Sequence, residues 1–192
     1  MPENTEQKIL SAARQCFFQH GYKATNMTLI SEYAGFSRAT VHKYFKNKDD
    51  AFRQVCQQLQ QQASAACIPI LQKELDCWQS IHAIAETWLK PTFDEVSDQR
   101  IVSDLKYHVQ HVAQDIFNEA RQSIEDMLTN LLENAASQQK ITFEYINIQP
   151  RMLAKLLVAS LDGLRGHLEK PSLEQASLDI LKIFQQACQP NR

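Results

Sequence analysis

The segment AGFSRATVHKYFKNK (34–48) gathers side chains that can bind a polyanion. Arg38 can form a bidentate pair with guanine O6 and N7, and Thr40 can approach a thymine methyl group or a phosphate. Lys43 and Lys48 carry donors with the reach for phosphate oxygens. These residue types are typical of contact with double-stranded DNA, although a solvated helix face with ordinary surface Lys and Arg is the simpler alternative.

Three short helices are predicted within residues 5–46 to position these side chains, and the turn AGFS (34–37) joins the last two. A glycine breaks the second helix, Ser37 caps the third, and Val41 and Phe45 hold the third helix to a core. Two helices joined in this way form a helix-turn-helix. Its second helix enters the major groove of DNA and presents its N-terminal residues to base edges.

The distribution of charge agrees with a nucleic-acid partner. Residues 1–55 carry eight Lys and Arg against five Asp and Glu, a net charge of +3, whereas the rest of the chain has a net charge of −5. A basic N-terminal segment joined to an acidic remainder indicates that the N-terminal segment binds a polyanion. On charge alone, a chance excess of three charges is an equally good explanation.

The composition predicts an all-α protein. The chain has 192 residues, and its four glycines leave a gap from Gly35 to Gly163 that is too long for a β-protein rich in tight turns. Gln, Ala, Leu, Lys and Glu, which favour helices, dominate that gap. Beyond the first three helices, we predict a loop at 138–149 and helices at about 48–73, 76–96, 100–109, 112–137, 150–169 and 172–188.

The sequence predicts a cytoplasmic protein that does not associate with a membrane. No apolar stretch is long enough to span a bilayer, and MPENTEQKIL lacks the regions of a secretory signal. The five cysteines are scattered and form no CxxC pair, which fits reduced thiols. A redox-sensing role has no support, because no neighbouring residue clearly lowers a thiol pKa.

No pattern of an enzyme is present, so neither catalysis nor a cofactor is predicted. The chain has no GxSxG, P-loop, HExxH or Rossmann fingerprint. His108, His111 and Asp115 are spaced to share one helix face, with Asp104 one turn earlier, and such a face can present metal ligands. A polar helix stripe is the better explanation, because metal sites need a more convergent set of ligands. We therefore expect no metal.

Residues 9–55 resemble the DNA-binding region of the TetR family of bacterial transcriptional regulators. The family pattern combines a helix ending in phenylalanine, a Gly-aromatic pair, an Ala-Thr pair, an Ala-Gly-hydrophobic-Ser turn and a Tyr-Phe pair before a lysine that opens the fourth helix. So many residues at the correct spacing make the match specific. The chain matches at Phe17, Gly21-Tyr22, Ala24-Thr25, Ile30, Ala34-Gly35-Phe36-Ser37, Arg38, Thr40, Tyr44-Phe45, Lys48 and Phe52.

The resemblance implies a division of labour along the chain. Residues 1–46 are the expected DNA-binding domain, and residues 47–192 are the expected helical domain that binds a small effector and forms a homodimer. The implied function is a ligand-responsive transcriptional repressor on a palindromic operator, with repressor following only from the family tendency. The effector, the operator and the regulated genes do not follow from the resemblance.

Nine residues are predicted to contact DNA. Two of them depart from the family pattern, since Ala39 stands where the family has glycine and His42 where it has tyrosine. Ala39 can contact a thymine methyl group, and His42 adds a donor whose charge depends on pH. Both departures indicate a particular operator rather than lost binding. The predicted contacts are Thr28, Ser37, Arg38, Ala39, Thr40, His42, Lys43, Tyr44 and Lys48.

The larger domain offers candidates for the effector pocket. Apolar and aromatic side chains with occasional polar groups recur along its middle helices, and a cavity between helices has such a lining. For each residue, ordinary core packing is the stronger alternative, because aromatic side chains dominate cores. The predicted pocket residues are Trp78, His82, Trp88, Tyr107, His108, His111 and Phe117.

The last two predicted helices are candidates for the dimer interface. Each is apolar on more than one face, and a helix with two apolar faces needs two partners. Two copies of the pair would form a four-helix interface, whereas burial inside a monomer is the alternative. The predicted interface residues are Leu157, Leu161, Leu164, Leu168, Leu181 and Phe184.

Two other classes of protein remain open from the residues alone. One alternative is a helical small-molecule-binding protein with an accidental helix-turn-helix. The other is an adaptor that uses its N-terminal helices for protein contact. Steep salt dependence of DNA binding separates a DNA-binding regulator from both, because counterion release scales with the number of phosphate contacts.

Overall fold

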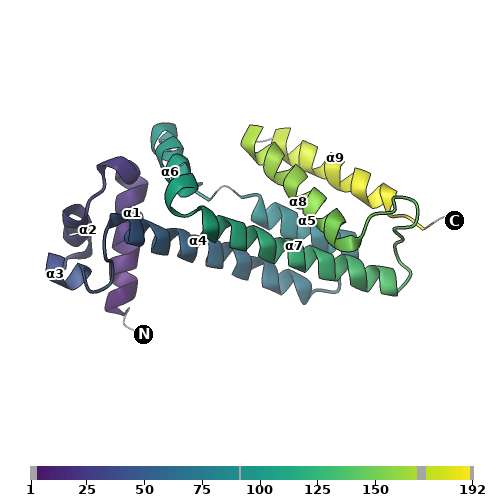
Figure 1. The fold of residues 1–192 in the computed structure, drawn as a ribbon, viewed down its shortest axis with the longest axis horizontal. Helices are drawn as coiled ribbons and strands as arrows, with labels where there is room; N and C mark the ends of the chain where they lie inside the picture. Colours follow the sequence, from purple (N-terminus) through teal and green to yellow (C-terminus); the bar gives the residue numbers. More distant parts are fainter. Residues whose placement is uncertain (1–3, 91, 168–171, 191–192) are drawn as a thin grey trace. The chain divides into compact units, whose positions relative to one another are not determined.

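The computed structural model describes residues 4–90, 92–167 and 172–190, and within these ranges its regular structure consists of nine α-helices. The all-α prediction is therefore confirmed. Figure 1 shows the helices in chain order: α1 (Thr5–Ala24), α2 (Met27–Ala34), α3 (Arg38–Val41), α4 (Lys48–Leu71), α5 (Cys77–Trp88), α6 (Gln99–Val112), α7 (Gln114–Ser137), α8 (Pro150–His167) and α9 (Ser172–Ala187).

The described residues of 1–62 and 91–118 form one compact unit. Phe17, Phe45 and Phe52 are fully buried in its core, and the rings of Phe17 and Phe52 meet edge to face at 5.0 Å. The apolar stripe of the first predicted helix is the buried face of α1, and Leu105 brings α6 onto the same core. The helix-turn-helix and α6 therefore share one hydrophobic core.

The described residues of 63–90 and 119–192 form the second compact unit. Its core combines apolar side chains of α5, α7, α8 and α9, such as Ile81, Leu128, Leu157 and Leu181. Asp76 begins α5 with a capping box, in which its carboxylate accepts a hydrogen bond from the Gln79 N–H at 2.8 Å. Within the described residues, no helix is both long and apolar enough to cross a bilayer.

Helix α5 is shorter than predicted. The helix expected at about 76–96, with a kink near residue 91, is too long, because α5 ends at Trp88 and the next helix begins at Gln99. The sequence contains the reason, since the proline at position 91 disfavours the helical conformation of the residue before it. The turn segment places Phe93 and Val96 in the core of the first unit.

Helix α1 is interrupted near its end. It continues to Ala24, but the backbone at Gly21 is not helical and its φ is +76°. A Cβ atom at this position would lie 2.7 Å from Asp104 Oδ2 of α6. The positive φ and the close approach together require glycine here.

Helix α4 contributes to both cores. Phe52, Val55 and Leu59 lie in the core of the first unit, whereas Cys67 and Ile70 lie in the core of the second. The compact units are therefore defined by packing and do not follow the predicted functional boundary after residue 46. That boundary stays a prediction.

Candidate nucleic-acid interface

The turn between α2 and α3 is built by local hydrogen bonds that its sequence specifies. Asn26 caps α2 by accepting a hydrogen bond from the Leu29 N–H at 3.0 Å, and Ser37 Oγ caps α3 by accepting from the Thr40 N–H at 3.1 Å. Gly35 ends α2 in the left-handed conformation with φ +68°. These caps fix the start of α3, which carries the predicted base-contacting residues.

The inward side of α3 and its following turn is fully apolar. Val41 and Phe45 are buried together with Ile30 of α2, so the short helix is fixed to the core of its unit. A helix of this length has little stability of its own, and packing must supply it. The core therefore sets the orientation of the opposite, outward side.

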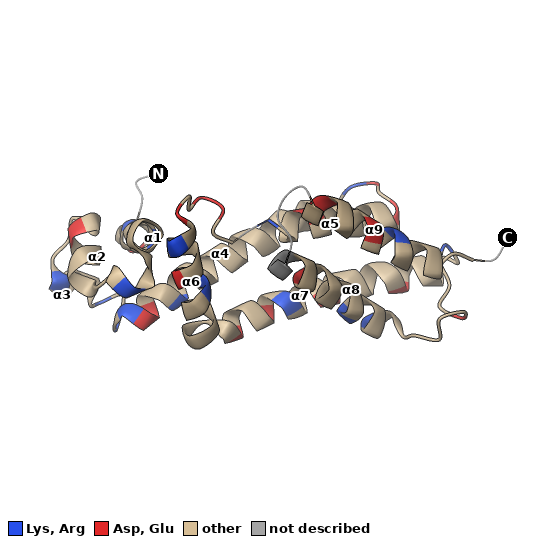
Figure 2. Ribbon diagram, turned by 90° about the horizontal axis from the view of Figure 1, so that it is seen from above, with Lys and Arg blue, Asp and Glu red and all other residues tan. Residues whose placement is uncertain are grey.

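Most of the predicted DNA contacts lie in α3 and the turn that follows it, where Figure 2 marks Lys and Arg positions along the ribbon. Six of the nine are exposed, namely Thr28, Ser37, Arg38, Ala39, His42 and Lys43, and the other three, Thr40, Tyr44 and Lys48, are half-buried. Exposed side chains at the N-terminal end of a recognition helix are those that reach base edges. Their role as DNA contacts stays a prediction.

Lys48 differs from the other predicted contacts because its ammonium group has partners inside the protein. Its Nζ donates a hydrogen bond to the Tyr22 carbonyl oxygen at 3.1 Å and lies 4.2 Å from the centre of the Tyr22 ring. Sequence reasoning identified Lys48 but missed Tyr22. The two residues are 26 positions apart, and no local pattern links them.

The geometry of a helix-turn-helix agrees with the family match. Residues 9–55 match the family model described as "Bacterial regulatory proteins, tetR family". This match confirms the predicted resemblance over the DNA-binding region of the TetR family.

Relatives with similar sequences match mainly through this N-terminal region. The HTH-type transcriptional regulator YhgD of Bacillus subtilis is 34% identical over 82 residues, which span 41% of this chain and 43% of YhgD. The HTH-type transcriptional repressor AcnR of Corynebacterium glutamicum is 37% identical over 51 residues, 27% of each chain. This chain thus spans less than half the length of either relative.

Solved structures of TetR-like proteins share the fold over nearly the whole chain. SmeT, the repressor of the Stenotrophomonas maltophilia multidrug efflux pump SmeDEF, superposes with a TM-score of 0.68 at 19% identity, covering 98% of this chain and 92% of SmeT. The fatty acid degradation regulator FadR of Bacillus halodurans superposes with the same TM-score at 19% identity, covering 96% and 95%. The TetR fold therefore extends past the matched DNA-binding region.

The predicted effector residues fall into two groups. Trp78, His82 and Trp88 lie on α5 in the second unit. Trp88 is part of the core and Trp78 packs against it, whereas His82 Nδ1 lies 3.6 Å from Glu86 Oε2. The other four residues, Tyr107, His108, His111 and Phe117, lie on α6 and α7 in the first unit. The role of these residues in binding an effector stays a prediction.

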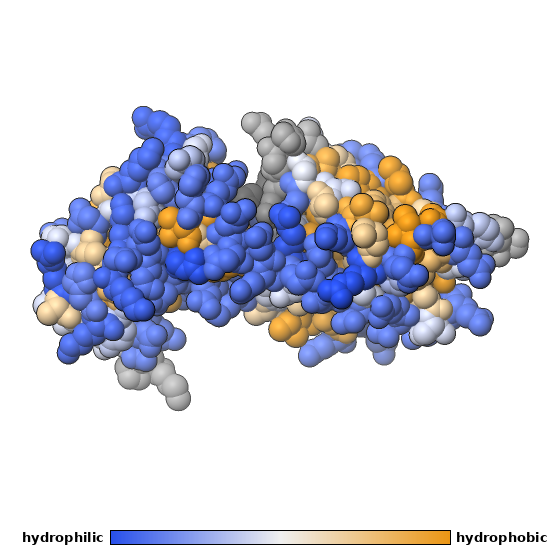
Figure 3. Space-filling view, viewed as in Figure 1, coloured by the Kyte–Doolittle hydropathy of each residue, from blue (hydrophilic) through white to orange (hydrophobic). Residues whose placement is uncertain are grey.

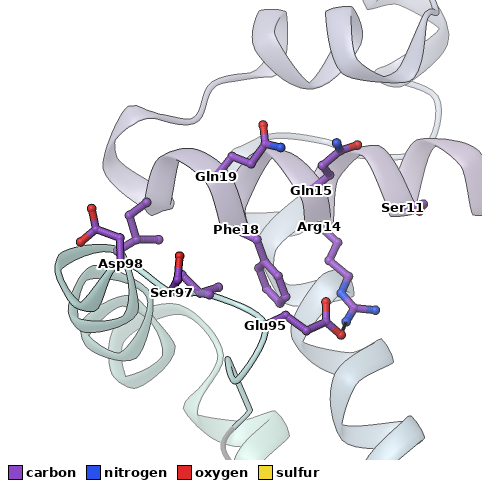
Figure 4. Close-up of a pocket in the computed structure, with 10 residues that line it drawn as sticks. Ser11, Arg14, Gln15, Phe18, Gln19, Glu95, Ser97 and Asp98 are labelled. Atoms are coloured by element: carbon purple, nitrogen blue, oxygen red, sulfur yellow. Dashed lines mark hydrogen bonds and ion pairs between the residues drawn. The ribbon is translucent and has the colours of Figure 1, made fainter.

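A groove of about 710 Å³ lies in the first unit, between α1 and residues 95–101. Phe18, Val96 and Ile101 form its apolar part, and polar side chains of α1 and the 95–98 segment line the rest (Figure 4). Arg14 closes one side through an ion pair with Glu95 at 2.5 Å. None of the seven predicted effector residues lines this groove.

The His and Asp residues weighed as metal ligands have other partners. Asp115 accepts two hydrogen bonds from Arg53, which hold the pKa of its carboxyl at about 2. His111 stacks on Tyr107 with ring centres 4.3 Å apart. Among the residues that the structure describes, no three His, Cys, Asp or Glu side chains are placed to hold a metal ion.

The cysteines of this protein are poor candidates for redox chemistry. Burial raises the pKa of the Cys56 thiol to about 12 and that of Cys77 and of Cys188 to about 11. A thiol with a raised pKa carries little of the reactive thiolate at neutral pH.

The predicted dimer residues lie mostly inside the subunit. Three of them, Leu157, Leu161 and Leu181, are buried in the core of the second unit. Leu164 and Phe184 are half-buried, and Leu168 lies outside the described residues. Their role in a dimer stays a prediction, because the chain's own packing already accounts for the burial of the first three.

Other apolar side chains on α8 and α9 face outward. Met152, Leu156 and Ile183 are exposed, and Figure 3 shows apolar side chains gathered on the face over these helices. We call these three residues the outer apolar face. None of the three is among the six predicted interface residues. Met152 and Leu156 are spaced i, i+4, so periodicity shows that they share a face but does not show which face the chain itself covers.

Proposed function

We propose that this protein is a transcriptional repressor that binds a palindromic operator as a homodimer and is released by a small, largely apolar effector. The observation that carries the proposal is the helix-turn-helix, with Val41 and Phe45 buried and Arg38, Ala39 and His42 on the outward side. Such a surface suits the major groove, where Arg reads guanine and a methyl group reads thymine. A regulator of chromosomal genes acts in the cytoplasm, which we propose as its location.

Homodimerisation is supported by the outer apolar face of α8 and α9. Exposed apolar residues gathered on one face mark an interaction site. A two-fold dimer uses the same surface on both subunits, and two recognition helices about 34–36 Å apart read a palindrome in successive major grooves. We therefore expect the operator to consist of two inverted half-sites.

Release by an effector is supported by a structural neighbour and by α4. A SmeT–triclosan complex superposes on this chain with a TM-score of 0.65 at 20% identity. Triclosan is small and largely apolar, and we propose the same class of ligand here. Since α4 begins next to the recognition helix and supplies residues to both cores, a change in its tilt alters the separation of the two recognition helices.

The energetics set a condition on this mechanism. The effector must bind the DNA-incompetent conformation more tightly than the DNA-competent one, since a ligand with equal affinity for both shifts nothing. Free and effector-bound dimers should therefore differ in the distance between spin labels attached to their recognition helices. Equal distances would contradict the mechanism.

Selection of duplexes from a random DNA pool tests the proposed function. We expect the purified protein to enrich one palindromic sequence, because a symmetric dimer reads two half-sites. A control selection uses Arg38→Ala, which should enrich the same spacing with a degenerate position in each half-site. Failure of the wild-type protein to enrich any sequence would favour a helical small-molecule binder or an adaptor over a regulator.

A further inference from the structure

Tyr22 lies between a residue of α6 and a residue of α4. The His108 ring stacks on Tyr22 with ring centres 4.0 Å apart and planes 18° apart, and Lys48 Nζ lies 4.2 Å from the same ring centre. Tyr22 is therefore in direct contact with both His108 of α6 and Lys48 of α4.

Asp104 of α6 contacts both His108 and the backbone that follows Tyr22. Its Oδ2 accepts a hydrogen bond from the Lys23 backbone N–H at 3.0 Å, and its Oδ1 lies 3.3 Å from His108 Nδ1. His108 Nδ1 also lies 2.8 Å from the backbone oxygen of Asp104. The close approach of Asp104 Oδ2 to Gly21 brings this part of α6 directly against the end of α1. Asp104 thus holds both His108 and the backbone next to Tyr22.

Lys48 of α4 is held by a hydrogen bond to the backbone of Tyr22. Its ammonium group has three N–H donors, and the Tyr22 carbonyl oxygen accepts one of them. The Tyr22 hydroxyl donates a hydrogen bond to Asp49, the next residue of α4. Tyr22 therefore restrains a flexible lysine side chain while two of its donors remain for another acceptor.

We propose that Asp104 and His108 are positioning residues for DNA binding, which hold Tyr22 so that Tyr22 presents Lys48 to a DNA phosphate. The proposal rests on the proposed function, because the acceptor is a phosphate of bound DNA. A lysine held in place before binding loses less conformational freedom when it meets the phosphate. Helix α6 thereby acts on DNA affinity without touching DNA.

A double-mutant cycle tests the proposal by separating positioning from general stability. Operator affinity is measured over a range of salt concentrations for the wild type, His108→Ala, Lys48→Ala and the double variant. We expect Lys48→Ala to weaken binding about tenfold and to reduce the salt slope by about 1, as loss of one phosphate contact does. His108→Ala should weaken binding about threefold to tenfold, and it should also reduce the salt slope, as Lys48→Ala does.

The decisive comparison is the effect of His108→Ala when Lys48 is already absent. If His108 acts through Lys48, the double variant binds no more weakly than Lys48→Ala alone. Multiplicative losses would overturn the proposal, since they would mean that the two residues act independently. Gln110→Ala is the control, because Gln110 is exposed on the same helix and should leave affinity unchanged.

A conservative variant keeps the test valid if His108→Ala folds poorly. His108→Phe retains a ring for the face of Tyr22 and should restore most of the lost affinity and the wild-type salt slope. A phenylalanine variant as weak as the alanine variant would overturn stacking as the cause. Phe17 and Phe52 also contact the Tyr22 ring, so we expect the core of the first unit to fold in both variants.

The failure of this proposal is distinguishable from that of the proposed function. If the wild-type protein shows no salt-dependent DNA binding, both are overturned. If the wild type binds its operator and Lys48→Ala lowers the salt slope, but the cycle shows independent losses, only the positioning role is overturned.

Discussion

At the scale of single residues, the recognition surface depends on a few side chains with different tasks. Arg38 is exposed at the first position of α3, where the proposed binding mode brings a guanidinium group to base edges, whereas Lys43 follows α3 and is proposed to contact a phosphate. Base contacts specify sequence and phosphate contacts supply general affinity. The two residues should therefore respond differently to substitution.

Replacing Arg38 with alanine should cost about 1–3 kcal/mol of operator binding and relax the preference at one base position. Affinities for the operator and for its single-base variants measure this effect. Lys43→Ala is the matched comparison, and it should weaken binding to all these duplexes to the same extent. If Arg38→Ala also weakened all duplexes equally, Arg38 would not be a base-reading residue.

Tyr22 should make the stability of the protein depend on alkaline pH. Burial, and then the hydrogen bond to Asp49, raise the pKa of the Tyr22 hydroxyl above its ordinary value of about 10. A raised folded-state pKa contributes stability that is fully present below the unfolded-state pKa and is lost as pH rises toward the folded-state value. The loss attributable to Tyr22 should therefore begin above about pH 10.

Tyr22→Phe tests this linkage. The free energy of unfolding of the variant should be about 1 kcal/mol lower than that of the wild type at pH 8, because the part-buried hydrogen bond from Tyr22 to Asp49 is lost. That difference should shrink above about pH 10, where ionisation destabilises only the wild type at this position. Denaturant unfolding at several pH values measures it, with the exposed Tyr145→Phe as the control. A difference that stays constant up to pH 11 would contradict the assigned pKa shift.

At the scale of elements, the helix-turn-helix could be predicted from sequence because its determinants are local. Asn26, Gly35 and Ser37 each act within four residues, through caps and a left-handed turn. The contact between α1 and α6 could not be predicted in this way. It joins Lys23 to Asp104 across 81 residues, and only the folded chain brings them together.

Two glycines allow a direct test of that long-range contact. Gly21 and Gly35 both have positive φ, but a Cβ atom at Gly21 meets Asp104, whereas one at Gly35 meets nothing within 4 Å. Gly35→Ala should cost about 1–2 kcal/mol of stability from backbone strain alone. Gly21→Ala should cost at least about 1 kcal/mol more, since the Gly21 backbone (φ +76°, ψ 177°) lies in a region that essentially only glycine adopts and its Cβ would meet Asp104.

Denaturant unfolding of both glycine variants gives the comparison. In the Asp104→Ala background, the excess cost of Gly21→Ala should fall, because the atom that Cβ meets has been removed. Equal costs for the two single variants would mean that α6 yields freely and does not constrain the end of α1.

At the scale of the whole molecule, hydrophobic periodicity predicted the helices but not which of their faces stay uncovered. Leu156 and Leu157 are adjacent in α8, and the sequence treats them alike. The structure leaves 43% of Leu156 exposed and buries all but 1% of Leu157. The difference depends on packing against distant helices, which is why three of the six predicted dimer contacts fall on buried residues.

These neighbouring leucines test the dimer surface. Leu156→Asp should convert a dimer to a monomer without unfolding it, because it places a charge in the outer apolar face. Leu157→Ala should instead cost about 2–5 kcal/mol of stability by leaving a cavity in the core. Sedimentation and thermal unfolding together separate the two effects. A Leu156→Asp protein that remains dimeric would place the interface elsewhere.

The central claim is that the folded chain is a sequence-specific, dimeric DNA-binding protein. The most direct test is the affinity of the wild-type protein for its selected palindrome and for a scrambled duplex, each measured across a series of salt concentrations. We expect two protomers per palindrome, affinity at least about 10³-fold tighter than for the scrambled duplex, and a steep loss with salt. Equal, weak and salt-insensitive binding to both duplexes would contradict the account.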